Sequence, residues 1–232
     1  MSYIKSSYAH RGERLRRIDR IRKTLIVVGL LGVVALLPRE RARVAEASPA
    51  SSASAFPFSI ADARRMHAEL DATKGQLTLA QAQLDRANAV IEYSATYKVG
   101  ADIAGSIYDV ALAEGIEPDL GFRLVRVESE FKEHATSRVG ALGLTQVMPS
   151  TAREFVPGIT REQLYDRKTN LQIGFRYLRG LIDEYKGDVK LALLVYNRGP
   201  VAVESLRALG LDPRNGYEAA VTRGYNGKGT VD

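Results

Sequence analysis

The chain of 232 residues contains no cysteine and only three histidines. Without cysteine it can form neither disulfides nor thiolate metal sites, which fits a reducing compartment or an exported protein that folds without bridges. The histidines, His10, His67 and His134, lie far apart, and no metal-binding spacing such as HExxH occurs. We therefore expect neither a metal nor a cofactor.

The net positive charge of the chain is confined to its first fifth. Residues 1–43 hold eleven Lys and Arg against three acids, whereas the net charge of the whole chain is only +6. Residues 44–232 therefore carry a small negative net charge. Because the segment long enough to fold is nearly neutral, we expect no nucleic acid as a partner.

The basic N-terminus is followed by an apolar run over residues 24–37 that Pro38 closes. As a helix this run covers about 20 Å, less than the ~30 Å of a bilayer core, so residues 24–38 are either a marginal membrane anchor or a cleaved signal segment. Cleavage would suit Ala45-Glu46-Ala47 or Ala53-Ser54-Ala55. The arginines that follow the run favour the anchor, with residues 1–23 in the cytoplasm and the rest in the periplasm. Cleavage would make the protein secreted.

Residues 39–58 are predicted to be a linker, since from residue 44 they are mostly small and polar with two prolines. Residues 59–97 then predict one long helix. Its heptad positions form the following two rows: Ala63, Leu70, Leu77, Leu84 and Ile91; Met66, Thr73, Ala80, Ala87 and Ser94. This pattern indicates a coiled coil that joins copies of the chain through residues 59–94 or acts as a spacer. The alternative is a helix packed on its own domain.

From residue 98 to the end, apolar residues recur at spacings of three and four, which predicts an all-helical domain. A helix that begins near Pro118 carries Glu128 on its apolar face, four residues after Leu124, whereas Glu130 points elsewhere. Apolar surroundings raise the pKa of a carboxyl group, as a general acid requires. The alternative from this helix alone is a partly buried glutamate paired with an arginine.

Four sequence blocks follow in order and bear on this choice. They are Glu128-Ser129, Gly140-Ala141-Leu142-Gly143-Leu144-Thr145-Gln146-Val147-Met148-Pro149, Asn170-Leu171-x-x-Gly174-x-x-Tyr177-Leu178, and Tyr196-Asn197-x-Gly199-Pro200. Together they resemble the motifs of the soluble lytic transglycosylase (SLT) family, which is related to goose-type lysozyme. The resemblance covers about residues 98–226.

The resemblance implies an all-α, lysozyme-like catalytic domain over residues 98–232 that binds the glycan strands of peptidoglycan. It also implies that Glu128 is the catalytic acid and then base, which cleaves the bond between N-acetylmuramic acid and N-acetylglucosamine and leaves a 1,6-anhydro end. The implied substrate-binding residues are Ser137, Gln146, Met148, Tyr196, Asn197 and Tyr225. A hydrolytic muramidase and a catalytically weak glycan-binding scaffold remain as alternatives.

The chain also departs from the family pattern at two positions. Val221 stands where many relatives have glutamate, and Arg198 stands where they usually have alanine. Because Val221 precedes the motif that contains Tyr225, this departure makes Tyr225 the least secure of the expected binding residues.

Overall fold

The structure, a computed structural model, describes residues 59–231. Within this range the chain forms helices joined by loops, and extended residues pair only in isolated β-bridges. The all-helical prediction is therefore confirmed for the described residues. The predicted basic segment, the apolar segment 24–38 and the linker lie outside them. Among residues 59–231, no helix is both long enough and apolar enough to cross a membrane.

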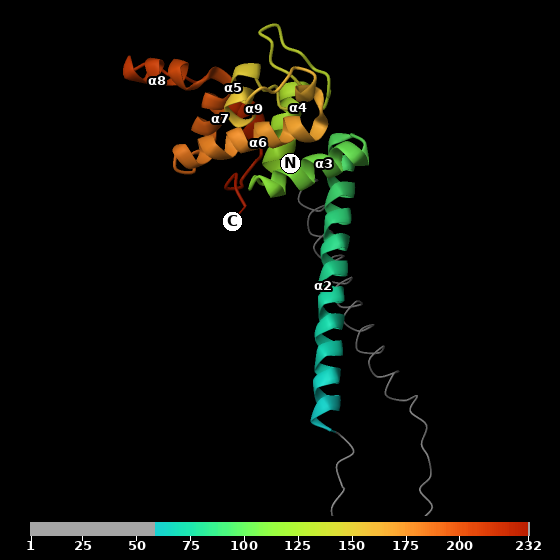
Figure 1. The fold of residues 1–232 in the computed structure, drawn as a ribbon. Helices are drawn as coiled ribbons and strands as arrows, with labels where there is room; N and C mark the ends of the chain where they lie inside the picture. The colour runs from blue at the N-terminus through green and yellow to red at the C-terminus, as the bar shows by residue number, and fades with distance from the viewer. Residues whose placement is uncertain (1–58, 232) are drawn as a thin grey trace, which may run out of the picture. The chain divides into compact units, whose positions relative to one another are not determined.

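The helices follow one another with short connections except for the loop between α4 and α5 (Figure 1). Their bounds are α2 Ile60–Tyr97, α3 Ala101–Ala113, α4 Pro118–Ser129, α5 Pro149–Phe155, the 3-10 helix η1 Gln163–Tyr165, α6 Arg167–Glu184, α7 Val189–Arg198, α8 Pro200–Ala208 and α9 Tyr217–Thr222. Proline at the first position of α4, α5 and α8 starts each of these helices, because its missing N–H costs nothing there. Asp166 caps α6 by accepting a hydrogen bond from the Thr169 N–H at 2.8 Å.

Helix α2 extends away from the other helices for most of its length (Figure 1). Val90 is its single buried residue. Only the C-terminal part of α2 packs on the domain, where the Tyr93 ring stacks on Phe122 at 4.2 Å between centroids and Arg86 pairs with Asp109. Leu77 is 70% exposed. The long helix is thus present as predicted, and it is not packed along its length against its own domain.

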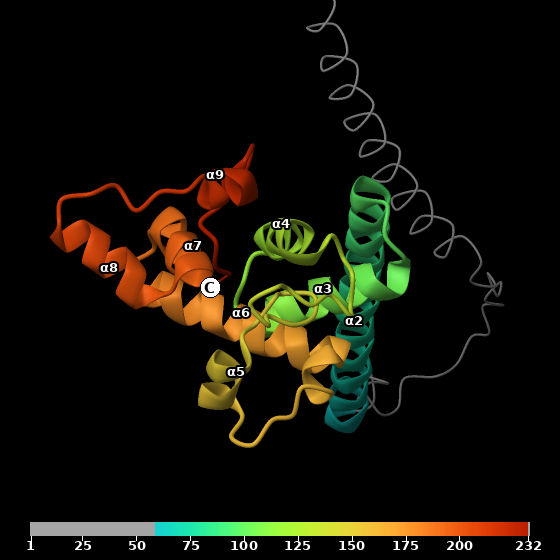
Figure 2. The same cartoon turned by 90° about the horizontal axis from the view of Figure 1, so that it is seen from above.

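The hydrophobic core lies between α3, α4, α6 and α7, and α6 passes between α3 and α5 (Figure 2). The fully buried side chains of Phe122 and Leu124 on α4 belong to this core together with those of Phe175 and Leu178 on α6. Each helix contributes residues spaced three or four apart, so a single apolar stripe faces the core. A smaller cluster under α5 includes Leu142, Leu164 and Ile173. Since α6 supplies both clusters, it is the central helix of the domain.

The loop between α4 and α5 is fastened to α6 by one buried side chain. The Asn170 amide donates to the carbonyls of Leu142 and Leu164 at 2.9 Å, and its oxygen accepts from the Thr145 N–H at 2.9 Å. The close contact between this loop and α6 requires a glycine in each of them, Gly143 in the loop and Gly174 on the helix. A Cβ on Gly143 would lie 2.2 Å from the Asn170 amide, and one on Gly174 would lie 2.3 Å from the Thr145 hydroxyl.

Candidate active site

Glu128 stands one residue before the end of α4, and the chain turns sharply directly after this helix. Glu130 and Phe131 both adopt a left-handed backbone conformation, with φ of 51° and 63°. Such angles are uncommon for residues other than glycine and often occur near functional sites. Glu128 thus lies in the last turn of α4 and is partly buried. Glu130 is exposed and pairs with Lys132 at 2.9 Å.

The environment of Glu128 changes its acidity. Burial raises the pKa of Glu128 to about 7, while a hydrogen bond from Tyr217 opposes this shift. The hydrogen bond between Glu130 and Lys132 instead lowers the pKa of Glu130. Glu128 therefore holds a proton at neutral pH far more readily than an ordinary glutamate, as a general acid must.

Tyr217, the first residue of α9, contacts the candidate acid directly. Its hydroxyl donates a hydrogen bond to Oε1 of Glu128. Helix α9 packs against both α4 and α7, so the tyrosine is held between them. Burial and the nearby charge of Glu128 raise the pKa of Tyr217 well above its ordinary value, which keeps the hydroxyl protonated and able to donate.

Tyr196 near the end of α7 lies beside the same carboxyl group. Its hydroxyl donates to the Thr145 carbonyl at 2.9 Å, and its ring packs against Tyr177 at 5.2 Å between centroids. The pKa of Tyr196 is raised well above its ordinary value by burial first and then by the charge of Glu128. Tyr196 thus connects α7, the loop before α5 and the candidate acid.

Four of the predicted binding residues line one cavity of about 470 Å³ between α5, α6 and α7. These are Gln146, Met148, Tyr196 and Asn197. Met148 is 36% exposed, so its thioether is available as an apolar contact. Amide, thioether and aromatic groups gathered in one cavity are the combination that contacts the polar edges and apolar faces of sugars.

Two of these cavity residues are positioned by polar contacts. Gln146 has a φ of 48°, and its side-chain nitrogen donates to the carbonyls of Gly143 at 2.9 Å and Ala135 at 3.2 Å. Both amide hydrogens are therefore engaged, which leaves the amide oxygen as the group for a ligand. The side-chain oxygen of Asn197 accepts from Asn215 at 2.9 Å, so it joins α7 to the loop before α9.

The other two predicted binding residues lie elsewhere. The Ser137 hydroxyl accepts from the Ala141 N–H at 2.9 Å within the loop after α4. The Tyr225 hydroxyl donates to Glu117, at the start of α4. Eleven residues of helix, about 16 Å at 1.5 Å per residue, separate Glu117 from Glu128, so this hydroxyl is directed away from the candidate acid.

The two departures from the expected family pattern also have structural counterparts. Val221 is fully buried in the main core, so an apolar side chain packs where many relatives are expected to have a glutamate. Arg198 donates to the Pro213 carbonyl at 3.1 Å and lines the cavity beside Asn197. Its guanidinium therefore tethers the loop before α9.

Tyr217 was not predicted as a site residue, because its partner lies 89 positions earlier in the chain. No local spacing links a tyrosine after Gly216 to a glutamate on α4, and only the packing of α9 brings them together. Among residues 59–231, no cluster of three or more His, Asp or Glu side chains is arranged to hold a metal ion.

Comparison with known proteins adds an independent observation to this geometry. Residues 106–209 match the family described as the transglycosylase SLT domain. This part of the chain is therefore similar to that family. The matched range contains Glu128 and the four residues that line the cavity, whereas Tyr217 and Tyr225 lie beyond it.

The relatives found by sequence match only about a third of the chain. A transglycosylase of Enterobacteria phage PRD1 is 42% identical over 84 residues, which cover 36% of this chain and 30% of the phage protein. Membrane-bound lytic murein transglycosylase C of Actinobacillus pleuropneumoniae is 40% identical over 78 residues, 31% of this chain and 21% of the relative. The chain thus spans less than a third of the length of either relative.

A solved structure of an inactive mutant of lytic transglycosylase Slt from Pseudomonas aeruginosa is also similar. It is 27% identical with a TM-score of 0.43, over 50% of this chain and 21% of that one.

Proposed function

We propose that the SLT domain of this chain is a peptidoglycan lytic transglycosylase in which Glu128 is the catalytic acid and base. The observation that carries the proposal is the raised pKa of Glu128, about 7, at the rim of α4 beside Tyr196 and Tyr217. The names of the relatives, a transglycosylase and a lytic murein transglycosylase, support the same substrate and reaction class.

In the first step Glu128 donates its proton to the oxygen of the bond between N-acetylmuramic acid and N-acetylglucosamine. The bond from that oxygen to the anomeric carbon breaks, and the substrate's own acetamido oxygen bonds to that carbon in place of an enzyme nucleophile. Glycosidases that use this substrate assistance need no second carboxylate. The N-acetylglucosamine leaves with a free hydroxyl group.

In the second step the carboxylate of Glu128 takes the proton of the muramic acid 6-hydroxyl. The freed oxygen attacks the anomeric carbon and displaces the acetamido oxygen, which closes the 1,6-anhydro ring. Glu128 is then protonated again, and no water is consumed. A glutamate with a pKa near 7 suits both steps, because neither protonation state is strongly favoured at neutral pH.

The cavity lined by Gln146, Met148, Tyr196 and Asn197 is proposed to hold the glycan strand. We include Ser137 and Tyr225 in the proposed binding set on the family resemblance alone, since neither lines this cavity. The hydrogen bond from Tyr225 to Glu117 fastens the C-terminal segment to the start of α4.

Turnover of purified sacculi separates this enzyme from the alternative of a glycan-binding scaffold. The full chain should release soluble muropeptides continuously, and the release should stop in Glu128→Gln while glycan binding persists. A wild-type chain that binds sacculi but releases nothing would favour the scaffold and overturn the proposal.

For residues 24–38 we propose a membrane anchor that keeps the SLT domain on the periplasmic side. The basic residues before the apolar run support this orientation, and one relative is named as membrane-bound. Fractionation tests it: the full chain should sediment with membranes after a high-salt wash, and residues 56–232 should remain in the supernatant. A full-length chain in the supernatant would contradict the anchor.

For α2 we propose parallel pairing between two copies of the chain. An isolated, weakly amphipathic helix is marginal in water, and α2 exposes an apolar row, Leu70, Leu77, Leu84 and Ile91. In a parallel coiled coil with this row at the a positions, Glu69 of one copy would face Lys74 of the other. Residues 56–232 should therefore show a dimer by molar mass at high concentration, and a monomer throughout would refute the pairing.

A further inference from the structure

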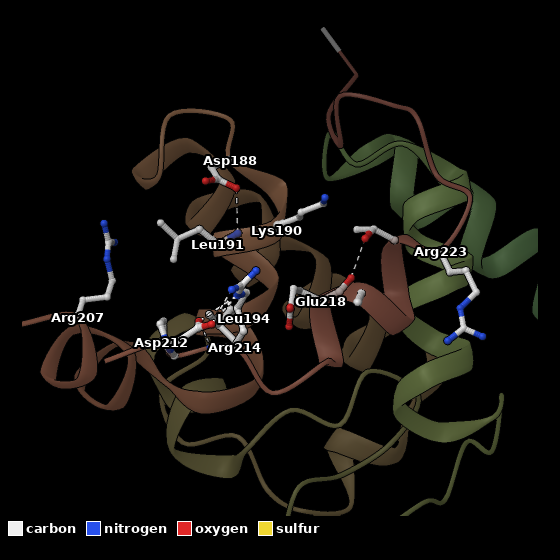
Figure 3. Close-up of a pocket in the computed structure, with 12 residues that line it drawn as sticks. Asp188, Lys190, Leu191, Leu194, Arg207, Asp212, Arg214, Glu218 and Arg223 are labelled. Atoms are coloured by element: carbon white, nitrogen blue, oxygen red, sulfur yellow. Dashed lines mark hydrogen bonds and ion pairs between the residues drawn. The ribbon is translucent and has the colours of Figure 1, made fainter. Parts of the chain in front are cut away.

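A second cavity, of about 610 Å³, lies between the N-terminal half of α7, the end of α8 and α9. Figure 3 shows side chains from α7, α9 and the loop before α9 around it. Leu191, Leu194 and Pro213 give it an apolar lining. It shares no lining residue with the cavity that contains Gln146, Met148, Tyr196 and Asn197.

Glu218 lines this cavity and is almost completely buried, with 7% of its surface exposed. Its Oε2 atom is buried and accepts no hydrogen bond from the residues that the structure describes. A buried carboxylate oxygen without a donor is costly, and such atoms are rare in folded proteins. Glu218 therefore lacks a hydrogen-bond donor that a ligand can supply.

The other two acids of this cavity already have partners. Asp188 caps α7 by accepting from the Leu191 N–H at 3.0 Å. Asp212 holds Arg214 through both carboxylate oxygens, at 2.6–3.0 Å from the guanidinium nitrogens. Arg214 interacts with Glu218 through charge, but it forms neither a hydrogen bond nor an ion pair with it.

The rim of the cavity is cationic. Lys190, Arg207 and Arg223 line it, and none of them forms an ion pair with another residue among 59–231. The cavity thus combines a buried carboxyl group, one oxygen of which has no hydrogen-bond partner, with three cations that form no ion pair and with an apolar wall. A ligand that matches this arrangement carries an ammonium group, nearby carboxylates and small apolar groups.

Helix α9 connects this cavity to the candidate active site. Tyr217 donates to Glu128, and Glu218, the next residue, lines the second cavity. Neighbouring residues on a helix project about 100° apart, so one short helix serves both places. A substrate with a branch beside the cleaved bond can therefore occupy both.

We propose that this cavity binds the peptide stem of peptidoglycan, with the ammonium of its diamino acid on Glu218 and its carboxylates on Lys190, Arg207 and Arg223. The inference rests on the proposed function, because it assigns the peptide part of the same substrate. The apolar wall of Leu191, Leu194 and Pro213 then contacts the alanine methyl of the stem.

Calorimetry with a stem tripeptide tests the assignment. The probe is L-alanyl-γ-D-glutamyl-meso-diaminopimelate, and its matched control carries an acetylated side-chain amine. The full-length wild type should bind the free amine at least tenfold more tightly than the acetylated peptide, because a charge-assisted bond to a buried carboxylate is lost. In Glu218→Gln this preference should disappear.

A matched variant and a stability measurement make the result unambiguous. Glu162→Gln removes an exposed glutamate that does not line the cavity, and it should keep the full preference for the free amine. Thermal melting of Glu218→Gln should show a folded protein. Equal affinity of the wild type for both peptides, or an unchanged preference in Glu218→Gln, would overturn the inference.

Failure of this inference is distinguishable from failure of the proposed function. If the wild type cleaves sacculi but does not discriminate between the peptides, the peptide-stem site is wrong and the transglycosylase stands. If the wild type discriminates between the peptides but never cleaves sacculi, the proposed activity is wrong. The second cavity would then bind the peptide, but not as part of an enzyme substrate, so the inference would be overturned as well.

Discussion

Helices α4 and α2 both carry apolar residues in regular rows, yet only those of α4 are buried. Leu124 on α4 is fully buried, whereas Leu77 on α2 is 70% exposed. The difference is one of partners, because α3 and α9 pack on α4, while α2 meets its own domain only near its C-terminal end. The same pattern thus forms a core in one place and leaves an open surface in the other.

The comparison also explains where shifted acidity occurs. Glu128 stands four residues after Leu124 on α4, Tyr217 of α9 contacts its carboxyl group, and burial is the main cause of its raised pKa. No carboxylate on α2 has such an enclosure, since the acids of that helix are largely exposed. Packing around α4 therefore produces both its stability and its proposed chemistry.

The largest expected effect is the difference in activity between substitutions on the buried face and on the exposed face of α4. Glu128→Gln should lower the rate of sacculus cleavage about 10³- to 10⁴-fold, because one group serves as both acid and base. Glu130→Gln, two residues on and exposed, should keep most of the activity. Turnover measurements on both variants check this. Equal losses would mean that the buried face of α4 is not the catalytic one.

Leucine truncation compares α4 with α2 directly. Leu124→Ala should lower the free energy of unfolding by about 2–5 kcal/mol, because a fully buried side chain leaves a cavity. Leu79→Ala, at a 60% exposed position of α2, should change it by less than about 0.5 kcal/mol. Urea unfolding of residues 56–232 measures both. A large loss of unfolding free energy in Leu79→Ala would show that other residues bury this position of α2.

The raised pKa of Glu128 also predicts how stability depends on pH. Folding raises this pKa from an ordinary 4.5 to about 7, so the protonated group favours the folded state. That contribution is complete below pH 4.5 and is lost as the pH rises through about 7. At pH 8 Glu128→Gln should therefore be about 3 kcal/mol more stable than the wild type, as judged by urea unfolding. A variant less stable than the wild type at pH 8 would contradict the conclusion that burial raises the pKa of Glu128.

The smallest effect should follow loss of the Tyr217 hydroxyl. Its hydrogen bond lowers the pKa of Glu128, so Tyr217→Phe should raise that pKa further. Because the first step needs protonated Glu128, kcat/KM should fall at alkaline pH, and the fall should move to higher pH in the variant. The loss at the optimum should be about tenfold or less. An unmoved pH profile would remove Tyr217 from the site.

Much of this arrangement follows from sequence patterns that act locally. The helix start at Pro118, the cap at Asp166 and the position of Glu128 on the apolar face all depend on neighbours within about four residues. Gln146, Met148, Tyr196 and Asn197 required more, namely a family pattern that places distant segments together. The structure brings those four into one cavity.

What the sequence could not predict depends on distant contacts. Tyr217 reaches Glu128 across 89 positions, and Tyr225 reaches Glu117 across 108. Both contacts depend on how the segment after α8 returns to α4, and no periodicity in that segment encodes its path. The burial of Glu218 could not be predicted for the same reason, since α9 packs against α4 and α7, which lie far from it in the sequence.

The most direct test of the proposed activity is mass spectrometry of muropeptides released from sacculi by the full-length protein in ¹⁸O-labelled water. If Glu128 passes the proton of the 6-hydroxyl as proposed, the products should carry 1,6-anhydro ends, lighter by one water than reducing ends, and should contain no label. Reducing ends that carry ¹⁸O would contradict the account and identify a hydrolytic muramidase.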